Sequence, residues 1–197
     1  AIKAPAVWAR QSGGDPDAAW RAIETMDRRH GQATGLFTGD ECLAGKSPSQ
    51  GTELCAVVEY MFSLEQCLAI TGDPRYADRL ERIAFNALPA TFKPDMGAHQ
   101  YDQQANQVVC AVSDDRVYTT NGPDANIYGL EPNYGCCTAN MHQGWPKFAQ
   151  HLWMKTQDGG LVCAAYAPSR VTTEIKGVRV TVTLDTGYPF RDTMTFT

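Results

Sequence analysis

Two adjacent cysteines, Cys136 and Cys137, limit how this 197-residue chain can fold. They lie in the stretch Tyr134–Asn140, after a glycine and at what reads as the first turn of a helix. A disulfide between neighbours closes a strained ring, whereas two neighbouring thiolates can face one soft metal ion, for which zinc is the usual choice. A helix start and a bound cation would both lower the pKa of the thiols. Burial as two small core residues is the competing interpretation.

A second motif, Gly51-Thr52-Glu53-Leu54-Cys55, lies upstream. Glu53 and Cys55 are two positions apart and would point about 200° from each other on a regular helix. They can converge on one ion only if Glu53 lies in a non-helical entry before the first turn, where Thr52 offers a capping hydroxyl. Three thiolates and one carboxylate then surround a tetrahedral ion. The predicted metal ligands are Glu53, Cys55, Cys136 and Cys137.

Composition excludes several classes of partner. The net charge is −5, and no run of Lys or Arg forms a basic face for nucleic acid or an anionic membrane. We expect no apolar run of bilayer length. Seven cysteines at irregular spacing are not a disulfide framework. Reduced thiols fit better and favour a cytoplasmic setting.

Helices are predicted in the first three quarters of the chain. Residues 1–14 hold no periodic pattern, and apolar side chains then repeat at helical spacing. Gly72-Asp73-Pro74 combines a C-terminal glycine, a capping aspartate and a first-turn proline, so the helices on either side should be antiparallel neighbours. The expected helices span residues 15–30, 52–70, 75–88 and 138–154.

Strands are predicted after Asp158-Gly159-Gly160. Residues 161–167 form an apolar run, residues 178–184 alternate between apolar and polar, and another strand begins at Met194. The fold class is therefore α+β, with a helical portion over residues 1–157 and the beginning of a β domain over residues 158–197.

Three polar loops are candidates for function. Residues 32–50 form a glycine-rich loop that carries Glu41, and loops of that length are usually functional or disordered. Residues 99–107 and 119–126 are rich in amides and aromatic rings, which suit the hydroxyls and C–H faces of sugars. On composition alone, ordinary polar loops are the favoured interpretation. The candidate sugar contacts are His99, Tyr101, Gln103, Asn121 and His142.

Together these elements resemble the β-L-arabinofuranosidase family of glycoside hydrolases. The resemblance rests on residues 51–55, on Asn133–Asn140 and on the helix pair between Cys55 and Pro89, and it extends from about Thr34 to Ser169. It implies part of an (α/α)6 barrel followed by the start of a β-sandwich. It also implies a zinc ion bound by one glutamate and three cysteines, and a carbohydrate substrate.

Carried onto this sequence, the resemblance makes Glu53, Cys55 and Cys137 zinc ligands, and Cys136 both ligand and nucleophile. Glu41 becomes the acid/base, although its separation from Glu53 is shorter than in the characterised arabinofuranosidases. The expected function is a retaining glycosidase that acts on β-L-arabinofuranosides or a related glycoside. No nucleic acid and no membrane are expected as partners.

Two other functions remain open. Four protein ligands also describe a structural zinc site, as in a non-catalytic carbohydrate-binding or scaffold module. A cysteine acyl-transfer enzyme would use Cys136 with His99 or His142, but no sequence feature links either histidine to that thiol.

The four helices are fewer than the twelve of a closed (α/α)6 barrel. We therefore expect a piece of a longer polypeptide, with the remaining segments or further copies of the chain as partners. The apolar faces of its helices should then be partly uncovered.

Overall fold

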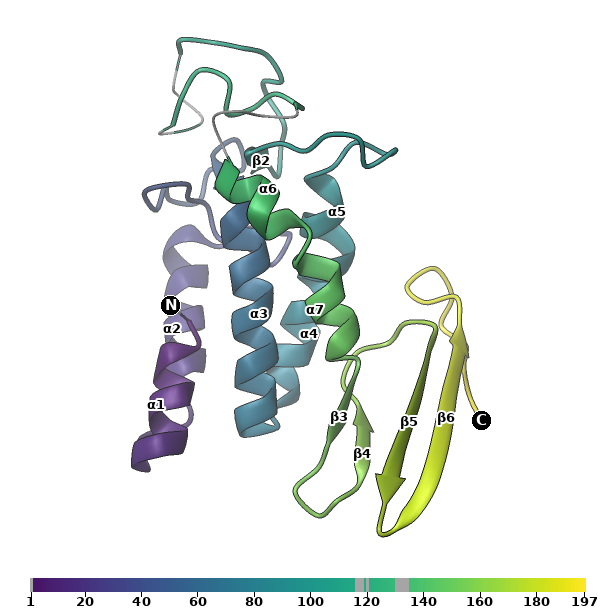
Figure 1. Ribbon diagram of the computed structural model, residues 1–197. Coiled ribbons are helices and arrows are strands. Elements are labelled where there is room, and N and C mark those ends of the chain that lie inside the picture. The colour runs from purple at the N-terminus through teal and green to yellow at the C-terminus, as the bar shows by residue number, and fades with distance from the viewer. Residues whose placement is uncertain (1, 116–118, 120, 130–134) are drawn as a thin grey trace. The chain divides into compact units, whose positions relative to one another are not determined.

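The computed structural model describes residues 2–115, 119, 121–129 and 135–197 (Figure 1). Its helices and small antiparallel sheets confirm the α+β class. The chain forms two compact units, Ala1–Pro146 and Lys147–Thr197.

The first unit is mainly helical. The helices of this unit are α1 (Ala4–Ser12), α2 (Ala18–His30), α3 (Leu54–Thr71), α4 (Pro74–Arg82), α5 (Leu88–Ala90) and α6 (Gly135–Met141), and α7 (Gly144–Gln150) spans the boundary between the two units. Helices α1 to α4 lie side by side in Figure 1, and α3 packs against α1, α4 and α6. Helix α4 continues through a π-helical turn, Ile83–Ala87, into α5.

The link between α3 and α4 has the predicted chemistry. Gly72 ends α3 in the left-handed conformation, with φ 69°, and its N–H donates to the Leu68 carbonyl over 2.8 Å. The carboxylate of Asp73 accepts a hydrogen bond from the Arg75 N–H at 2.9 Å, and Pro74 is the first residue of α4. Each residue matches its backbone position, so the boundary could be located from sequence.

Other boundaries differ from the predictions. Helix α1 occupies a segment without a predicted pattern, and α2 begins at Ala18 rather than residue 15. Residues 138–154 form α6, α7 and part of a strand rather than one helix. The helical spacing of the apolar residues continues across residues 142–143, but the turn there separates α6 from α7.

A two-stranded antiparallel sheet brings distant segments together in the first unit. Strand β1 (Gly51–Glu53) leads directly into α3 and pairs with β2 (Asp102–Gln104). Glu53 lies opposite Asp102 in this register. The predicted start of the helix at residue 52 is therefore two residues early.

The second unit contains two antiparallel sheets. Strands β3 (Trp153–Lys155) and β4 (Leu161–Cys163) form one hairpin, and β5 (Ser169–Ile175), β6 (Val178–Thr186) and β7 (Met194–Phe196) form a three-stranded sheet. The strands predicted at residues 178–184 and from Met194 are confirmed. Strand β4 is shorter than the predicted 161–167, and β5 was not predicted.

The apolar stripes of the helices are buried. Leu54, Val58, Met61, Ile83 and Phe148 are each at most 5% exposed. The expected uncovered apolar surface is therefore absent at these positions, although Trp8 of α1 is 67% exposed.

Helix α3 also corrects the expectation that no apolar run reaches bilayer length. It has 18 residues with a mean hydropathy of 1.4, enough by length and composition to cross a membrane. Half of that window is buried within the protein, and the core helix of a soluble protein passes the same test.

Candidate metal centre

The junction between β1 and α3 places Glu53 and Cys55 as the metal-site prediction requires. Glu53 is the N-cap residue of α3, in the extended conformation with φ −62° and ψ 138°, and Cys55 is the second residue of the helix. The backbone of Glu53 is held by Gly39, whose carbonyl accepts a hydrogen bond from the Glu53 N–H at 3.0 Å. Thr52 does not cap the helix; its hydroxyl donates to the Phe37 carbonyl over 2.8 Å.

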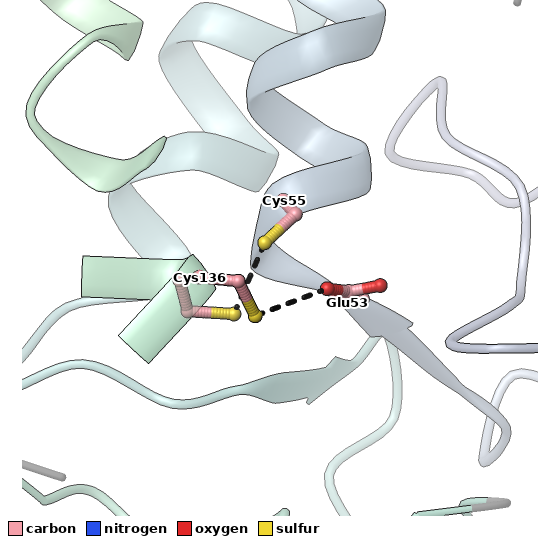
Figure 2. Close-up of side chains that lie close together, drawn as sticks. Glu53, Cys55 and Cys136 are labelled. Carbon is pink, nitrogen blue, oxygen red and sulfur yellow. Dashed lines mark hydrogen bonds between the residues drawn. The ribbon is translucent and has the colours of Figure 1, made fainter. Parts of the chain in front are cut away.

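Helix α6 carries both adjacent cysteines, and Figure 2 shows Cys136 beside Glu53 and Cys55. The thiol sulfurs of Cys55 and Cys137 are 3.5 Å apart, and Cys136 Sγ is 3.8 Å from Glu53 Oε1. One ligand atom from each of the four residues lies within 4.8 Å of the others. All seven cysteines are free, so the pair is not a disulfide. Tyr134, at the start of the motif, lies outside the described residues.

The four donors fit a zinc ion. Sulfur ligands at about 2.3 Å in a tetrahedral shell lie roughly 3.8 Å from one another, close to the spacings found here. Cysteine sulfur and carboxylate oxygen are both ligands that zinc accepts. Within the described residues, this is the one group of three or more metal-binding side chains close enough to share an ion.

The protein's own groups disfavour charge at this site. Burial raises the pKa of Glu53, and the nearby Glu41 and Asp40 carboxylates add to the effect. Burial and the neighbouring Cys55 raise the pKa of Cys136. In the protein without a metal ion, the pKa of Cys136 is therefore raised rather than lowered. A divalent cation acts in the opposite direction, because it favours thiolate and carboxylate.

The two adjacent thiols differ in accessibility. Cys137 is fully buried and faces Cys55, whereas Cys136 is exposed. Of this pair, Cys136 is the thiol that a molecule arriving from solvent can reach.

Glu41 is connected to the same junction through Tyr101. The Tyr101 hydroxyl donates to Glu41 Oε1 at 3.5 Å and accepts from Asn121 Nδ2 at 2.8 Å. The Tyr101 carbonyl accepts from the N–H of Leu54, the first residue of α3, at 2.8 Å. Three predicted site residues therefore form one chain of contacts, and Glu41 is exposed at its end.

The other candidate sugar contacts are arranged differently. Gln103 is 6% exposed and its amide donates to the Ala87 carbonyl at 2.9 Å. His99 is 4% exposed, and its Nε2 lies 3.1 Å from the Thr138 hydroxyl. His142 is exposed and donates from Nδ1 to the Thr138 carbonyl at 3.1 Å. Each histidine has a contact with Thr138, the residue that follows the adjacent cysteines.

Asp102 is a residue that sequence reasoning missed. It is fully buried, and its two carboxyl oxygens make no hydrogen bond within the described residues. Burial, reinforced by the charge of Asp40, raises the pKa of Asp102 to about 8. The nearby Thr119 side chain lowers this pKa and offsets part of the effect. No local pattern marks Asp102, since its burial follows from the pairing of β2 with β1.

The chain belongs to the family of beta-L-arabinofuranosidase GH127 catalytic domains, whose family model matches residues 15–150. That match covers both cysteine motifs and Glu41. No curated protein matches the chain at a significant level.

Solved structures share the fold. Ara127N-Se, a GH127 beta-L-arabinofuranosidase from Geobacillus stearothermophilus T6, is 20% identical with a TM-score of 0.74. A structure described as a glycoside hydrolase is 18% identical with a TM-score of 0.73, and BT3674, a GH127 beta-arabinofuranosidase, is 18% identical with a TM-score of 0.68. Each match covers 95% of this chain and 30%, 34% and 28% of the other chain, respectively, so the chain spans about a third of their length.

Proposed function

We propose that this chain provides the zinc and nucleophile site of a retaining glycoside hydrolase that acts on β-L-arabinofuranosides or a related glycoside. Family membership supports hydrolysis of a glycoside. The observation that carries the mechanism is the convergence of Glu53, Cys55, Cys136 and Cys137, with Cys136 the exposed member of the adjacent pair.

In the proposed first step, the thiolate of Cys136 attacks the anomeric carbon of the sugar. The bond from that carbon to the leaving oxygen breaks, and the carboxylic acid of Glu41 gives its proton to the departing oxygen. Tyr101, which contacts the Glu41 carboxyl group, and Asn121, which donates to the Tyr101 hydroxyl, would hold Glu41 in place.

In the second step, water attacks the anomeric carbon. The carboxylate of Glu41 takes the proton of the water, the carbon–sulfur bond breaks, and the electron pair returns to Cys136. Two displacements at one carbon retain the configuration, as in glycosidases that use a carboxylate nucleophile.

Glu53, Cys55, Cys136 and Cys137 would hold the zinc ion. When bound, it keeps the Cys136 thiol ionised, which offsets the raised pKa that burial gives this thiol. Because four protein ligands fill the shell, the ion supplies no bound water for hydrolysis.

A structural zinc site in a non-catalytic carbohydrate-binding module is the second candidate, because the closed four-ligand shell also suits that role. The two functions differ at Cys136. A structural site needs this residue only as a ligand, whereas the hydrolase needs its exposed thiolate as a nucleophile.

Activity on an aryl β-L-arabinofuranoside tests the proposal. The full-length protein should release the aryl alcohol, and the first sugar product seen by NMR should have the configuration of the substrate. Cys136→Ser should lower kcat by roughly 10³-fold or more, and Glu41→Gln by about 10²–10⁴-fold. Cys110→Ser, at another exposed free cysteine, is the control. Near-normal turnover by Cys136→Ser would exclude the nucleophile role and favour the structural site.

Metal analysis tests the cofactor separately. Protein purified without added metal should contain about one zinc per chain, and Cys55→Ala should lose most of it. A metal-free wild type with a Cys136–Cys137 disulfide would contradict the site.

A further inference from the structure

His99 contacts the helix that carries the adjacent cysteines. Its Nε2 lies 3.1 Å from the hydroxyl of Thr138, the residue after Cys137. Its Nδ1 lies 3.4 Å from the Gln100 carbonyl, which can only accept a hydrogen bond. With the proton of a neutral ring on Nδ1, Nε2 accepts a hydrogen bond from the Thr138 hydroxyl.

The backbone around His99 is fixed on two sides. His99 forms isolated β-bridges with Phe92 and with Gly129, and its carbonyl accepts from the Gly129 N–H at 3.1 Å. The next N–H, that of Gln100, donates to the Thr91 carbonyl over 2.9 Å. Because the residue is also only 4% exposed, the His99 ring is held in a well-defined place beside the Thr138 hydroxyl.

Helix α6, by contrast, depends on its surroundings. It has seven residues, and a helix this short is marginal without tertiary contacts. Cys137 packs against Cys55 of α3, and Cys136 approaches Glu53. Both contacts are between predicted metal ligands. The contact of the Thr138 hydroxyl with His99 holds the same turn of α6 through two residues that are not ligands.

We propose that His99 is a positioning residue, which sets through the Thr138 hydroxyl the orientation in which α6 presents Cys136 and Cys137 to Glu53 and Cys55. The part that His99 plays in catalysis rests on the proposed hydrolase. Its effect on the geometry of the two thiols is independent of that function. Residues beyond the direct ligands that orient a metal site typically change metal affinity or activity by 10–100-fold when removed.

The test compares two substitutions of one side chain. Thr138→Val removes the hydroxyl with little change of shape, and Thr138→Ser keeps it. Zinc affinity is measured by competition with a chromophoric chelator, and the alkylation rate of Cys136 is measured in metal-free protein. Thr138→Val and His99→Phe should each weaken zinc binding about tenfold and change the alkylation rate, and Thr138→Ser should match the wild type.

A double-mutant cycle then distinguishes positioning from other roles. If His99 acts through Thr138, the two substitutions together should weaken zinc binding no more than either alone. In the active enzyme each of the two substitutions should lower kcat and leave KM nearly unchanged, because the orientation of the nucleophile matters in the transition state. A raised KM for His99→Phe alone, with Thr138→Val unchanged, would make His99 a sugar contact and overturn the proposal.

The outcomes also separate this inference from the proposed function. A wild type without glycosidase activity would remove the proposed hydrolase and leave the zinc and alkylation measurements decisive. Thr138→Val with the zinc affinity and alkylation rate of Thr138→Ser would overturn the positioning role even in an active enzyme. If His99→Phe does not fold, Thr138→Val decides alone, since Thr138 is an exposed residue.

Discussion

The carboxyl group of Asp102 occupies the space that a side chain at position 51 would need: a Cβ on Gly51 would lie 2.0 Å from Asp102 Oδ2. Gly51 begins β1, whose last residue is the predicted ligand Glu53. The glycine of the Gly51–Cys55 motif is therefore required by a residue from a distant segment. It allows a buried carboxyl group to lie against the strand that leads into the metal centre.

Replacement of this glycine should disturb both the fold and the site. Gly51→Ala would force β1 away from Asp102, and overpacking of this kind costs about 1–3 kcal/mol of unfolding free energy. Urea unfolding measures the loss, and zinc affinity should fall with it because Glu53 moves with the strand. Gly129→Ala is the control, since its Cβ would meet no atom of the described residues closer than 3.9 Å. Equal stability of the two variants would contradict the close contact.

Asp102 should make stability depend on pH in a direction opposite to that of most carboxylates. Burial raises its pKa to about 8 in the folded protein, well above the ordinary value of 3.8. The folded state therefore holds a proton that the unfolded chain releases, so this contribution to stability is complete below pH 4 and is lost as the pH rises towards 8.

Asp102→Asn removes this titration with little change of shape. The unfolding free energy of the variant, relative to the wild type, should therefore increase between pH 5 and pH 8.5, by more than about 1 kcal/mol. Urea unfolding at the two pH values measures the change. A difference independent of pH would show that Asp102 ionises normally in the folded protein.

The adjacent cysteines should react at different rates. In metal-free native protein, iodoacetamide should modify exposed Cys136 before buried Cys137, and added zinc should protect Cys136. Peptide mass spectrometry after short exposure distinguishes the two residues. Comparable labelling of both thiols would show that α6 opens readily and would remove the distinction on which the nucleophile assignment rests.

The Glu53–Cys55 half of the candidate metal centre could be predicted because its requirement is local. Glu53 and Cys55 can share an ion only across a change of backbone conformation, and the structure has that change at residue 53. The boundary between α3 and α4 could be predicted for the same reason, since Gly72, Asp73 and Pro74 each suit one backbone position.

The environment of the site could not be predicted, because it depends on pairings between distant segments. The burial of Asp102 follows from the register of β1 with β2, and the contact of His99 with Thr138 joins residues 39 positions apart. Amide-rich stretches such as residues 99–107 resemble exposed polar loops in sequence. Here His99, Gln100, Tyr101, Asp102 and Gln103 are all buried.

The separation of the ligands along the chain also affects how the protein is made. Cys55 and Cys137 are 82 positions apart, so a ribosome that adds about 5–20 residues per second completes the set roughly 4–16 s after the first thiol. During that interval Glu53 and Cys55 are present without Cys136 and Cys137. The four predicted ligands can therefore meet only after Cys137 has been synthesised, and until then Cys55 lacks the thiol neighbour that it has in the finished structure.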